Sequence, residues 1–158
     1  MPATRPHVPE PPGPCACGRL RRASRALTQL YDDAMADSGL RVTQYSLLRT
    51  LVREGTVRMT DLAHAHLLDR TALARTLDPL VERGYAGVVP GSDARTRVVT
   101  ITPAGRAVLA GAEQLWRRAQ AEVAQRLGRD RFDTLIAVLA DLETLHPGAR
   151  ARAPKGTP

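Results

Sequence analysis

The sequence predicts a mainly α-helical chain with one small β-hairpin. Apolar residues recur at spacings of three and four along several segments, which is typical of helices with one buried face. Two short β-rich runs, 85–89 and 96–102, flank a Pro-Gly-Ser-Asp turn, which is typical of a hairpin. The length of 158 residues fits one ordinary domain, and an aromatic content of only 3% requires a core made mostly of leucine, valine and alanine.

The first predicted helix runs from about residue 16 to residue 37 and ends at Ser38-Gly39. Its apolar stripe comprises Leu20, Ala23, Leu27, Leu30, Tyr31 and Ala34. The proline-rich stretch 1–14 has no helical periodicity, so we expect a disordered arm there. Residues 147–158 predict a similar disordered tail, which is basic.

Two short helices and a stub of strand are predicted next. Thr43 is expected to cap the first helix, over residues 44–54, because its hydroxyl can accept a free backbone N–H group. Residues 56–60 contain a few β-tolerant residues, enough for a stub of strand. Thr60 with Asp61 is expected to start the second short helix.

A third, capped helix is predicted between Asp69 and Gly84. The Asp69 carboxylate can accept free N–H groups of the following turn, and Gly84 ends the helix. Pro79 removes one backbone hydrogen bond and is expected to bend it. One face comprises Leu73, Leu77, Leu80 and Val81, and another carries Arg70, Thr71, Ala74, Arg75 and Asp78.

Two further helices follow the hairpin. Thr102 is expected to cap a long helix with Pro103 at its first position, and Gly128 to end it. The residues predicted to face inward are Val108, Ala112, Leu115, Trp116, Ala119, Val123 and Leu127, followed on the last helix by Phe132, Leu135, Ile136, Leu139, Leu142 and Leu145. Two short helices at a tight turn, followed by a β-ribbon, predict a winged helix-turn-helix. The apolar stripes of the terminal helices are too wide for this small module to cover, so we expect a second copy of the chain to cover them.

The net charge of +7 is confined to the two ends of the chain. Residues 1–25 carry five arginines and one glutamate, and residues 146–158 carry two arginines and one lysine, so residues 26–145 are neutral. Basicity alone therefore does not indicate nucleic-acid binding. No apolar run approaches the roughly 18–20 residues of a membrane helix, and the N-terminus lacks the apolar middle of a signal peptide. We expect a cytoplasmic protein with reduced cysteines.

One continuous stretch, LDRTALARTLDPLVERGYAGVVPGSDARTRVVTITPAGR, carries a family likeness. It combines a recognition-helix pattern, an Asp-Ala-Arg wing and an Ile-Thr-Pro-Ala-Gly restart. In this order and spacing it resembles the MarR family of bacterial transcriptional regulators, and the likeness extends over roughly residues 16–145. The resemblance implies a dimer whose first and last helices interlock, with recognition helices in successive major grooves of DNA and wings reaching the flanking minor grooves.

The predicted organisation has five parts. They are a disordered arm at 1–14, an N-terminal dimerisation helix at 15–38, a winged helix-turn-helix DNA-binding lobe at 39–102, C-terminal dimerisation helices at 103–146 and a disordered basic tail at 147–158. Many members of the family that the chain resembles repress genes beside their own, and the resemblance implies the same kind of role here. These members release DNA on binding small phenolic or aromatic carboxylate compounds, or on cysteine oxidation.

Two groups of residues are predicted to contact DNA. The planar fork of arginine matches O6 and N7 of guanine, and a threonine methyl can touch the thymine methyl. The predicted contacts are Arg70, Thr71, Ala74 and Arg75 on the capped helix and Asp93, Arg95 and Arg97 in the wing. The resemblance implies that Arg95 enters the minor groove, whose negative potential favours arginine, and that Asp93 steadies the loop. The alternatives are a solvated helix face and an Asp93–Arg95 salt bridge with no role on DNA.

Tyr31, Tyr45, Arg49 and Trp116 are candidate effector-binding residues. The resemblance implies that their helices flank a ligand cleft between the dimerisation and DNA-binding parts. Aromatic rings can wall an aromatic compound there while an arginine holds its carboxylate. The alternative is that they are core residues and a surface arginine.

Cys15 and Cys17 are candidate redox residues. A separation of one residue disfavours an unstrained disulfide between them, but a thiol near a helix N-terminus with arginines nearby can be redox-reactive. The alternative is that they are ordinary small residues at the edge of a dimer. His64 and His66 face different directions on a short helix and make no chelating pair, so no metal site is predicted.

The sequence contains no catalytic motif, phosphate-binding glycine loop or zinc-spaced cluster, so it predicts neither an enzyme nor a cofactor. It predicts a homodimeric, sequence-specific regulator that binds double-stranded DNA at a pseudo-palindrome, a repressor relieved by a small aromatic or phenolic acid. Two alternatives stay open. One is a regulator switched by oxidation of Cys15 and Cys17, and the other is a winged-helix protein-interaction module that does not bind DNA.

Overall fold

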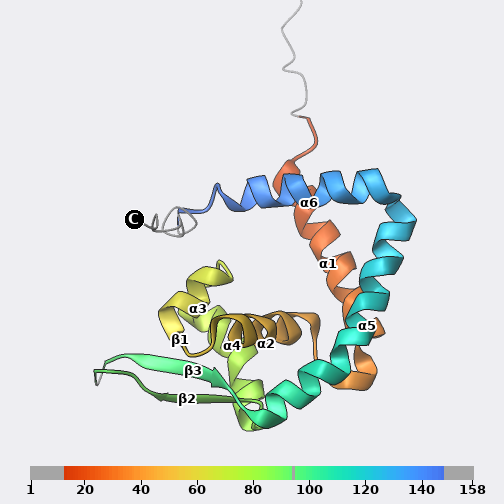
Figure 1. Ribbon diagram of the computed structural model, residues 1–158. Coiled ribbons are helices and arrows are strands. Elements are labelled where there is room, and N and C mark those ends of the chain that lie inside the picture. The colour runs from red at the N-terminus through yellow and green to blue at the C-terminus, as the bar shows by residue number, and fades with distance from the viewer. Residues whose placement is uncertain (1–12, 94, 148–158) are drawn as a thin grey trace, which may run out of the picture.

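The computed structural model describes residues 13–93 and 95–147. In chain order its elements are α1 (Ala16–Ala34), the 3-10 helix η1 (Ala36–Ser38), α2 (Val42–Glu54), β1 (Val57–Arg58), α3 (Met59–Ala65), α4 (Arg70–Glu82), β2 (Ala86–Pro90), β3 (Arg97–Ile101), α5 (Pro103–Leu127) and α6 (Arg129–Glu143). The predicted winged helix-turn-helix with long terminal helices is confirmed. The lobe of α2, α3, α4 and the strands lies along the first half of α5, while α1 and α6 lie at its other end (Figure 1).

The three strands form one small antiparallel sheet in the order β1-β3-β2. Val99 at the centre of β3 pairs with Val57 of β1 on one side and with Val88 of β2 on the other. The predicted stub of strand therefore extends the hairpin into a sheet. Because Val99 is fully buried, this sheet is anchored to the lobe through its central strand.

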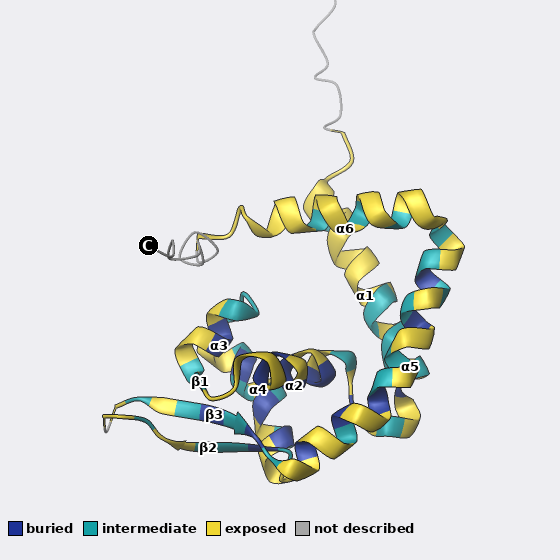
Figure 2. Cartoon of the chain, viewed as in Figure 1, coloured by how far each residue is buried: buried dark blue, intermediate teal, exposed yellow. Residues whose placement is uncertain are grey.

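The core lies where the lobe meets the first half of α5 (Figure 2). Leucines from several short elements make up most of it, as the low aromatic content predicts. The largest fully buried side chains are Tyr45, Met35, Leu47, Leu48, Leu51, Leu62, Leu73, Leu77, Leu80 and Val99. In contrast, neither α1 nor α6 contains a buried residue.

The predicted cap of α2 is wrong. The helix begins at Val42, one residue before Thr43, so Thr43 lies inside the first turn. The N–H of Val42 donates instead to Oδ1 of Asp32 on α1, at 2.7 Å. The N–H of Arg41 donates to Oε1 of Gln44, at 3.0 Å. The Asp32 carboxylate of α1 therefore takes the place of the Thr43 hydroxyl. The spacing of residues along the sequence does not reveal this contact.

Two further helix limits differ from the predictions. The second short helix, α3, begins at Met59 rather than at Thr60, because β1 leads directly into it. Likewise α1 ends at Ala34, and the next residues tighten into η1 before Gly39 adopts a φ of 68°. The cap of α5 is as predicted, since the Thr102 hydroxyl accepts the N–H of Gly105 at 3.0 Å.

No helix within the described ranges is long and apolar enough to cross a membrane.

Candidate nucleic-acid interface

The N-terminus of α4 is fixed by Asp69. Its Oδ1 accepts the backbone N–H of Ala72 at 2.7 Å, which is the predicted cap. Leu73, Leu77 and Leu80 then bury one face of the helix against the lobe. Val81, predicted on that face, is 36% exposed, because it lies at the edge of the leucine stripe. The cap and the leucines together determine which side of α4 faces solvent.

That outer side presents the residues predicted to read DNA. Arg70, Thr71 and Arg75 are exposed, and Ala74 between them is half-buried. The positions follow one another over the first two turns of the helix, so their side chains leave the lobe in neighbouring directions. A hollow beside this end of the helix is lined by Met59, Thr60, Ala63, His64, Leu68, Asp69 and Arg70. The predictions from sequence did not include this hollow.

The turn between α3 and α4 is held by contacts that the sequence reasoning missed. Leu67 has a φ of 53°, a left-handed conformation that a leucine rarely adopts. Next to it, Nε2 of His66 lies 3.0 Å from Oγ1 of Thr50 on α2, whose side chain is buried. The exposed His64 instead lines the hollow at α4. The two histidines thus have separate surroundings, as predicted, and His66 ties the turn to α2.

Asp93 braces the tip of the wing. One carboxylate oxygen accepts the backbone N–H groups of Arg95 and Thr96, both at 2.8 Å, and the other accepts the Thr96 hydroxyl at 2.8 Å. The Thr96 side chain, and then the N–H of Arg95, hold the pKa of Asp93 below its ordinary value. Asp93 contacts Arg95 through the backbone N–H of Arg95, and the ion pairs among the described residues do not include one between the two side chains. The guanidinium of Arg95 therefore stays available.

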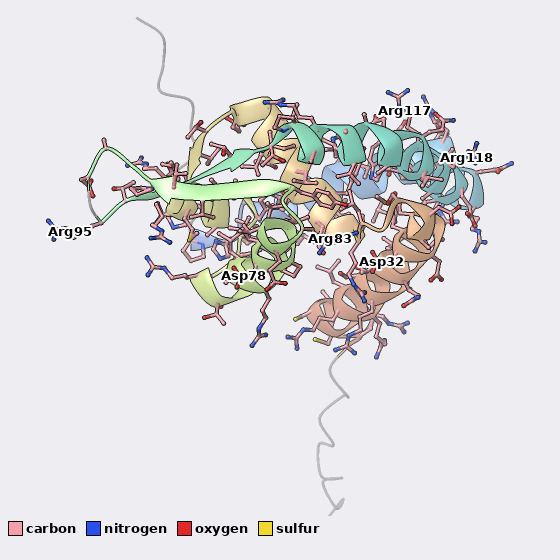
Figure 3. All side chains as sticks on the ribbon, turned by 90° about the horizontal axis from the view of Figure 1, so that it is seen from below. Asp32, Asp78, Arg83, Arg95, Arg117 and Arg118 are labelled. Atoms are coloured by element: carbon pink, nitrogen blue, oxygen red, sulfur yellow. The ribbon has the colours of Figure 1, made fainter. Side chains whose placement is uncertain are left out.

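The side chain of Arg95 points outward from the end of the wing (Figure 3). Arg97, two residues further on, is exposed at the first position of β3, where it pairs with Pro90 of β2. The lobe therefore has two cationic projections, one on α4 and one at the wing. Both are exposed on the same lobe, an arrangement that suits contact with two grooves of a duplex.

Three of the four candidate effector residues come together where the lobe meets α5. The rings of Tyr45 on α2 and Trp116 on α5 stack with centroids 5.7 Å apart. The guanidinium of Arg49 lies 4.8 Å from the Trp116 centroid and 5.8 Å from that of Tyr45. Tyr31 does not join them: its hydroxyl bonds to Gln120 further along α5. Tyr45 is a core residue, whereas Arg49 covers the two rings from the exposed side.

Glu113 completes this cluster and was not predicted. It accepts a hydrogen bond from the Tyr45 hydroxyl, and its other oxygen accepts Nε of Arg117 at 2.9 Å. The hydrogen bond from Tyr45, and next the one from Arg117, lower the pKa of Glu113, while burial and the same bond to Glu113 raise the pKa of Tyr45. The spacing of four between Glu113 and Arg117 was the one available signal, and it gave no hint of Tyr45.

The two cysteines lie at the start of α1. Cys15 occupies the cap position, with its Sγ accepting the N–H of Gly18 at 3.4 Å, and Cys17 lies in the first turn. Both thiols are free and exposed. Among residues 13–93 and 95–147, no group of three or more His, Cys, Asp or Glu side chains is placed to hold a metal ion.

Comparisons with known proteins agree with this architecture. The model of the MarR family matches residues 40–86. The transcriptional regulator MosR of M. tuberculosis, solved in complex with DNA, is 36% identical; the match covers 89% of this chain and all of that one, with a TM-score of 0.77. The transcriptional repressor CouR, bound to a 23-mer DNA duplex, is 28% identical over 81% of this chain and 92% of its own, with a TM-score of 0.74.

A third structure, of BpsR from Bordetella bronchiseptica, is 21% identical over 85% of this chain and 97% of its own, with a TM-score of 0.75, and shows the same fold. No curated protein sequence matches this chain. The identity and coverage of MosR, together with the family match, show that the chain belongs to the MarR family of transcriptional regulators. That family consists of DNA-binding transcription factors and not of enzymes, as the sequence predicts.

Proposed function

We propose that this regulator reads an operator with the first two turns of α4 and the tip of the wing. One observation carries the proposal: the Asp69 cap and the buried leucines turn Arg70, Thr71 and Arg75 outward on the lobe that also carries Arg95. Arginine and threonine are suited to base edges in the major groove, and the free N–H groups of α4 are suited to a phosphate. Arg95 and Arg97 are assigned to the flanking minor groove.

The operator-binding species is assigned as a homodimer. The terminal helices expose Leu20, Ile136, Val138 and Leu142, and Leu145 is exposed two residues after the end of α6, each at 41% or more. These apolar side chains occupy the segments that the sequence assigns to dimerisation, and a second copy of the chain can bury them. Two recognition helices related by a two-fold axis would read a pseudo-palindrome whose half-sites are about 10 base pairs apart.

The regulator is assigned as a repressor released by a small aromatic acid at the junction of α2 and α5. Tyr45 and Trp116 offer stacked rings, and Arg49 offers a guanidinium that a carboxylate can draw away from those rings. Occupation of this junction would change how the lobe sits on α5. BpsR, which shares the fold, has its DNA binding regulated by 6-hydroxynicotinic acid.

A thiol switch is the second candidate, and the position of Cys15 favours it. Its Sγ already accepts a hydrogen bond at the N-terminus of α1, and Cys17 is exposed two residues further on. Oxidation would alter the first turn of a helix assigned to the dimer. Comparing operator affinity before and after peroxide treatment, in the wild type and in a Cys15→Ser, Cys17→Ser variant, separates this switch from a ligand-only response.

Substitution of Arg95 tests the reading of DNA. With duplexes selected from a random library by the wild-type protein, Arg95→Ala is expected to weaken binding by about 1–3 kcal/mol at fixed salt. The matched control is Arg118→Ala, which removes an exposed arginine from α5, away from the lobe (Figure 3). Equal affinity of wild type and Arg95→Ala, with both proteins of the same oligomeric mass, would contradict the proposal. So would failure of the wild type to select any duplex.

A further inference from the structure

We propose that Arg83 and Asp32 are positioning residues that set the spacing of the two recognition helices. Both act on residues 39–42, a segment here named the connector, which joins the end of η1 to the start of α2. Arg83 follows the last residue of the recognition helix, and Asp32 belongs to the first dimerisation helix. Figure 3 shows Arg83 beside the end of α4 and Asp32 on α1. The inference rests on the proposed reading of DNA by α4.

Arg83 holds the first residue of the connector. Its Nη1 donates to the carbonyl oxygen of Gly39 at 2.7 Å, across 44 positions of sequence. Its guanidinium also lies 4.9 Å from the ring centroid of Tyr85, so the residue that leads into β2 supports the side chain as well. The end of α4 is thereby attached to the segment that comes from the dimerisation helix.

The residue at position 39 is a glycine, which leaves room for this contact. Its φ of 68° is one that side chains rarely adopt, and a Cβ added there would lie 2.9 Å from Nη2 of Arg83. The guanidinium therefore occupies the space that a side chain at this position would need. Glycine serves here both the turn after η1 and the close approach of Arg83.

Asp32 holds the last residue of the connector. Its Oδ1 accepts the N–H of Val42 at 2.7 Å, and its Oδ2 lies 3.3 Å from Nη1 of Arg41. The Asp32 side chain is only 15% exposed, whereas that of Arg41 is 76% exposed. The backbone contact is thus the protected one, and through it α1 supplies an acceptor for the first N–H of α2, beside the acceptor that Gln44 of α2 supplies to Arg41.

The two contacts give one geometrical consequence. The connector is fixed to α4 at one end by Arg83 and to α1 at the other by Asp32, so the direction of the recognition helix relative to the dimerisation helix is set over four residues. In a two-fold dimer that direction determines the distance between the recognition helices, and hence the half-site spacing that binds best. Neither side chain needs to touch DNA to have this effect.

A spacing series tests the inference. The probe is the duplex that the wild type selects from a random library, together with versions lengthened or shortened by one base pair between the half-sites. We expect Arg83→Gln to bind the selected duplex roughly tenfold more weakly, as for loss of a charged hydrogen bond, and to discriminate less between the three spacings. Asp32→Ala is expected to reduce the differences in affinity between the three spacings in the same way. Arg83→Lys, which keeps a donor, is expected to recover part of the discrimination.

The profile separates positioning from general damage to the fold. Each variant is compared with itself on three duplexes, so partial unfolding lowers all three affinities equally and leaves their ratios unchanged. Arg118→Gln, an exposed arginine on α5, is the control and should keep the wild-type profile. Unchanged ratios in Arg83→Gln and Asp32→Ala would overturn the inference while leaving the proposed function intact. A wild type that selects no duplex would overturn both.

Discussion

Apolar side chains of the winged lobe bury one another, whereas those of α1 and α6 are half-buried or exposed. Leu48, Leu62, Leu73 and Leu80 come from three short helices of the lobe, and each is fully buried. In α6, a longer helix than α3 and α4, Ile136 is 49% exposed and no residue is buried. The periodicity of apolar residues is similar in both regions.

The difference shows that an apolar stripe determines which face of a helix can be buried, but not whether another element is there to bury it. The lobe brings three helices and a sheet around one centre, so each stripe meets several others. The helix α1 packs mainly on α5 and has no buried residue, and α6 continues beyond α5 after the break at Gly128, whose φ is 81°. We therefore expect the lobe to be stable by its own packing and the terminal helices to depend on a second chain.

The largest effect is expected from a cavity in the lobe. Leu77 is 1% exposed, so Leu77→Ala should lower the free energy of unfolding by about 2–5 kcal/mol. Val81→Ala, one turn further along α4 at a position that is 36% exposed, is the matched control and should cost below about 1 kcal/mol. Urea unfolding followed by circular dichroism measures both. Equal losses of unfolding free energy in the two variants would contradict the placement of Leu77 in the core and of Val81 at its edge.

A charge on α6 should act on assembly and not on the lobe. Ile136→Asp places a carboxylate on the apolar face that a second chain is proposed to cover, so it should raise the dimer dissociation constant by roughly 30-fold or more. Ala137→Asp, also exposed but turned toward the side of α6 that carries Asp133 and Asp141, should leave that constant nearly unchanged. Sedimentation at a series of protein concentrations gives both constants. The same constant for the two variants would contradict the assigned dimer face.

Local rules predicted those parts of the structure that local contacts determine. The caps by Asp69 and Thr102 each join residues three apart, and both appear as expected. Likewise the hairpin follows from its turn, and the wing residues come close because the loop is short. The family resemblance added the order of these elements.

Contacts between residues far apart in sequence were the ones missed. The cap of α2 comes from Asp32 ten residues away, so the nearby Thr43 was assigned wrongly. Similarly, Glu113 bonds to Tyr45 across 68 positions, and Arg83 bonds to Gly39 across 44. These contacts depend on how helices pack, which one sequence without its relatives does not reveal.

The smallest predicted effect concerns the junction between the two regions, where Glu113 of α5 accepts hydrogen bonds from Tyr45 and Arg117. These bonds lower the pKa of Glu113 in the folded protein, so it is the ionised form that stabilises the fold. That contribution is complete above the ordinary glutamate pKa and is lost as the pH falls through the lowered value. Because the Glu113 side chain is 35% exposed, solvent screening should keep the contribution below about 1 kcal/mol.

Glu113→Gln keeps an acceptor for the Tyr45 hydroxyl but removes the charge. Its free energy of unfolding should fall below that of the wild type at neutral pH, and the two should converge in acid. Urea unfolding at intervals from about pH 7 to about pH 3 measures this difference. Glu122→Gln is the matched control, since Glu122 pairs with Arg126 on the same helix, and among the described residues its hydrogen bond and ion pair join it to no residue of the lobe. A gap between wild type and Glu113→Gln that stays constant with pH would show that packing, and not charge, joins α5 to the lobe here.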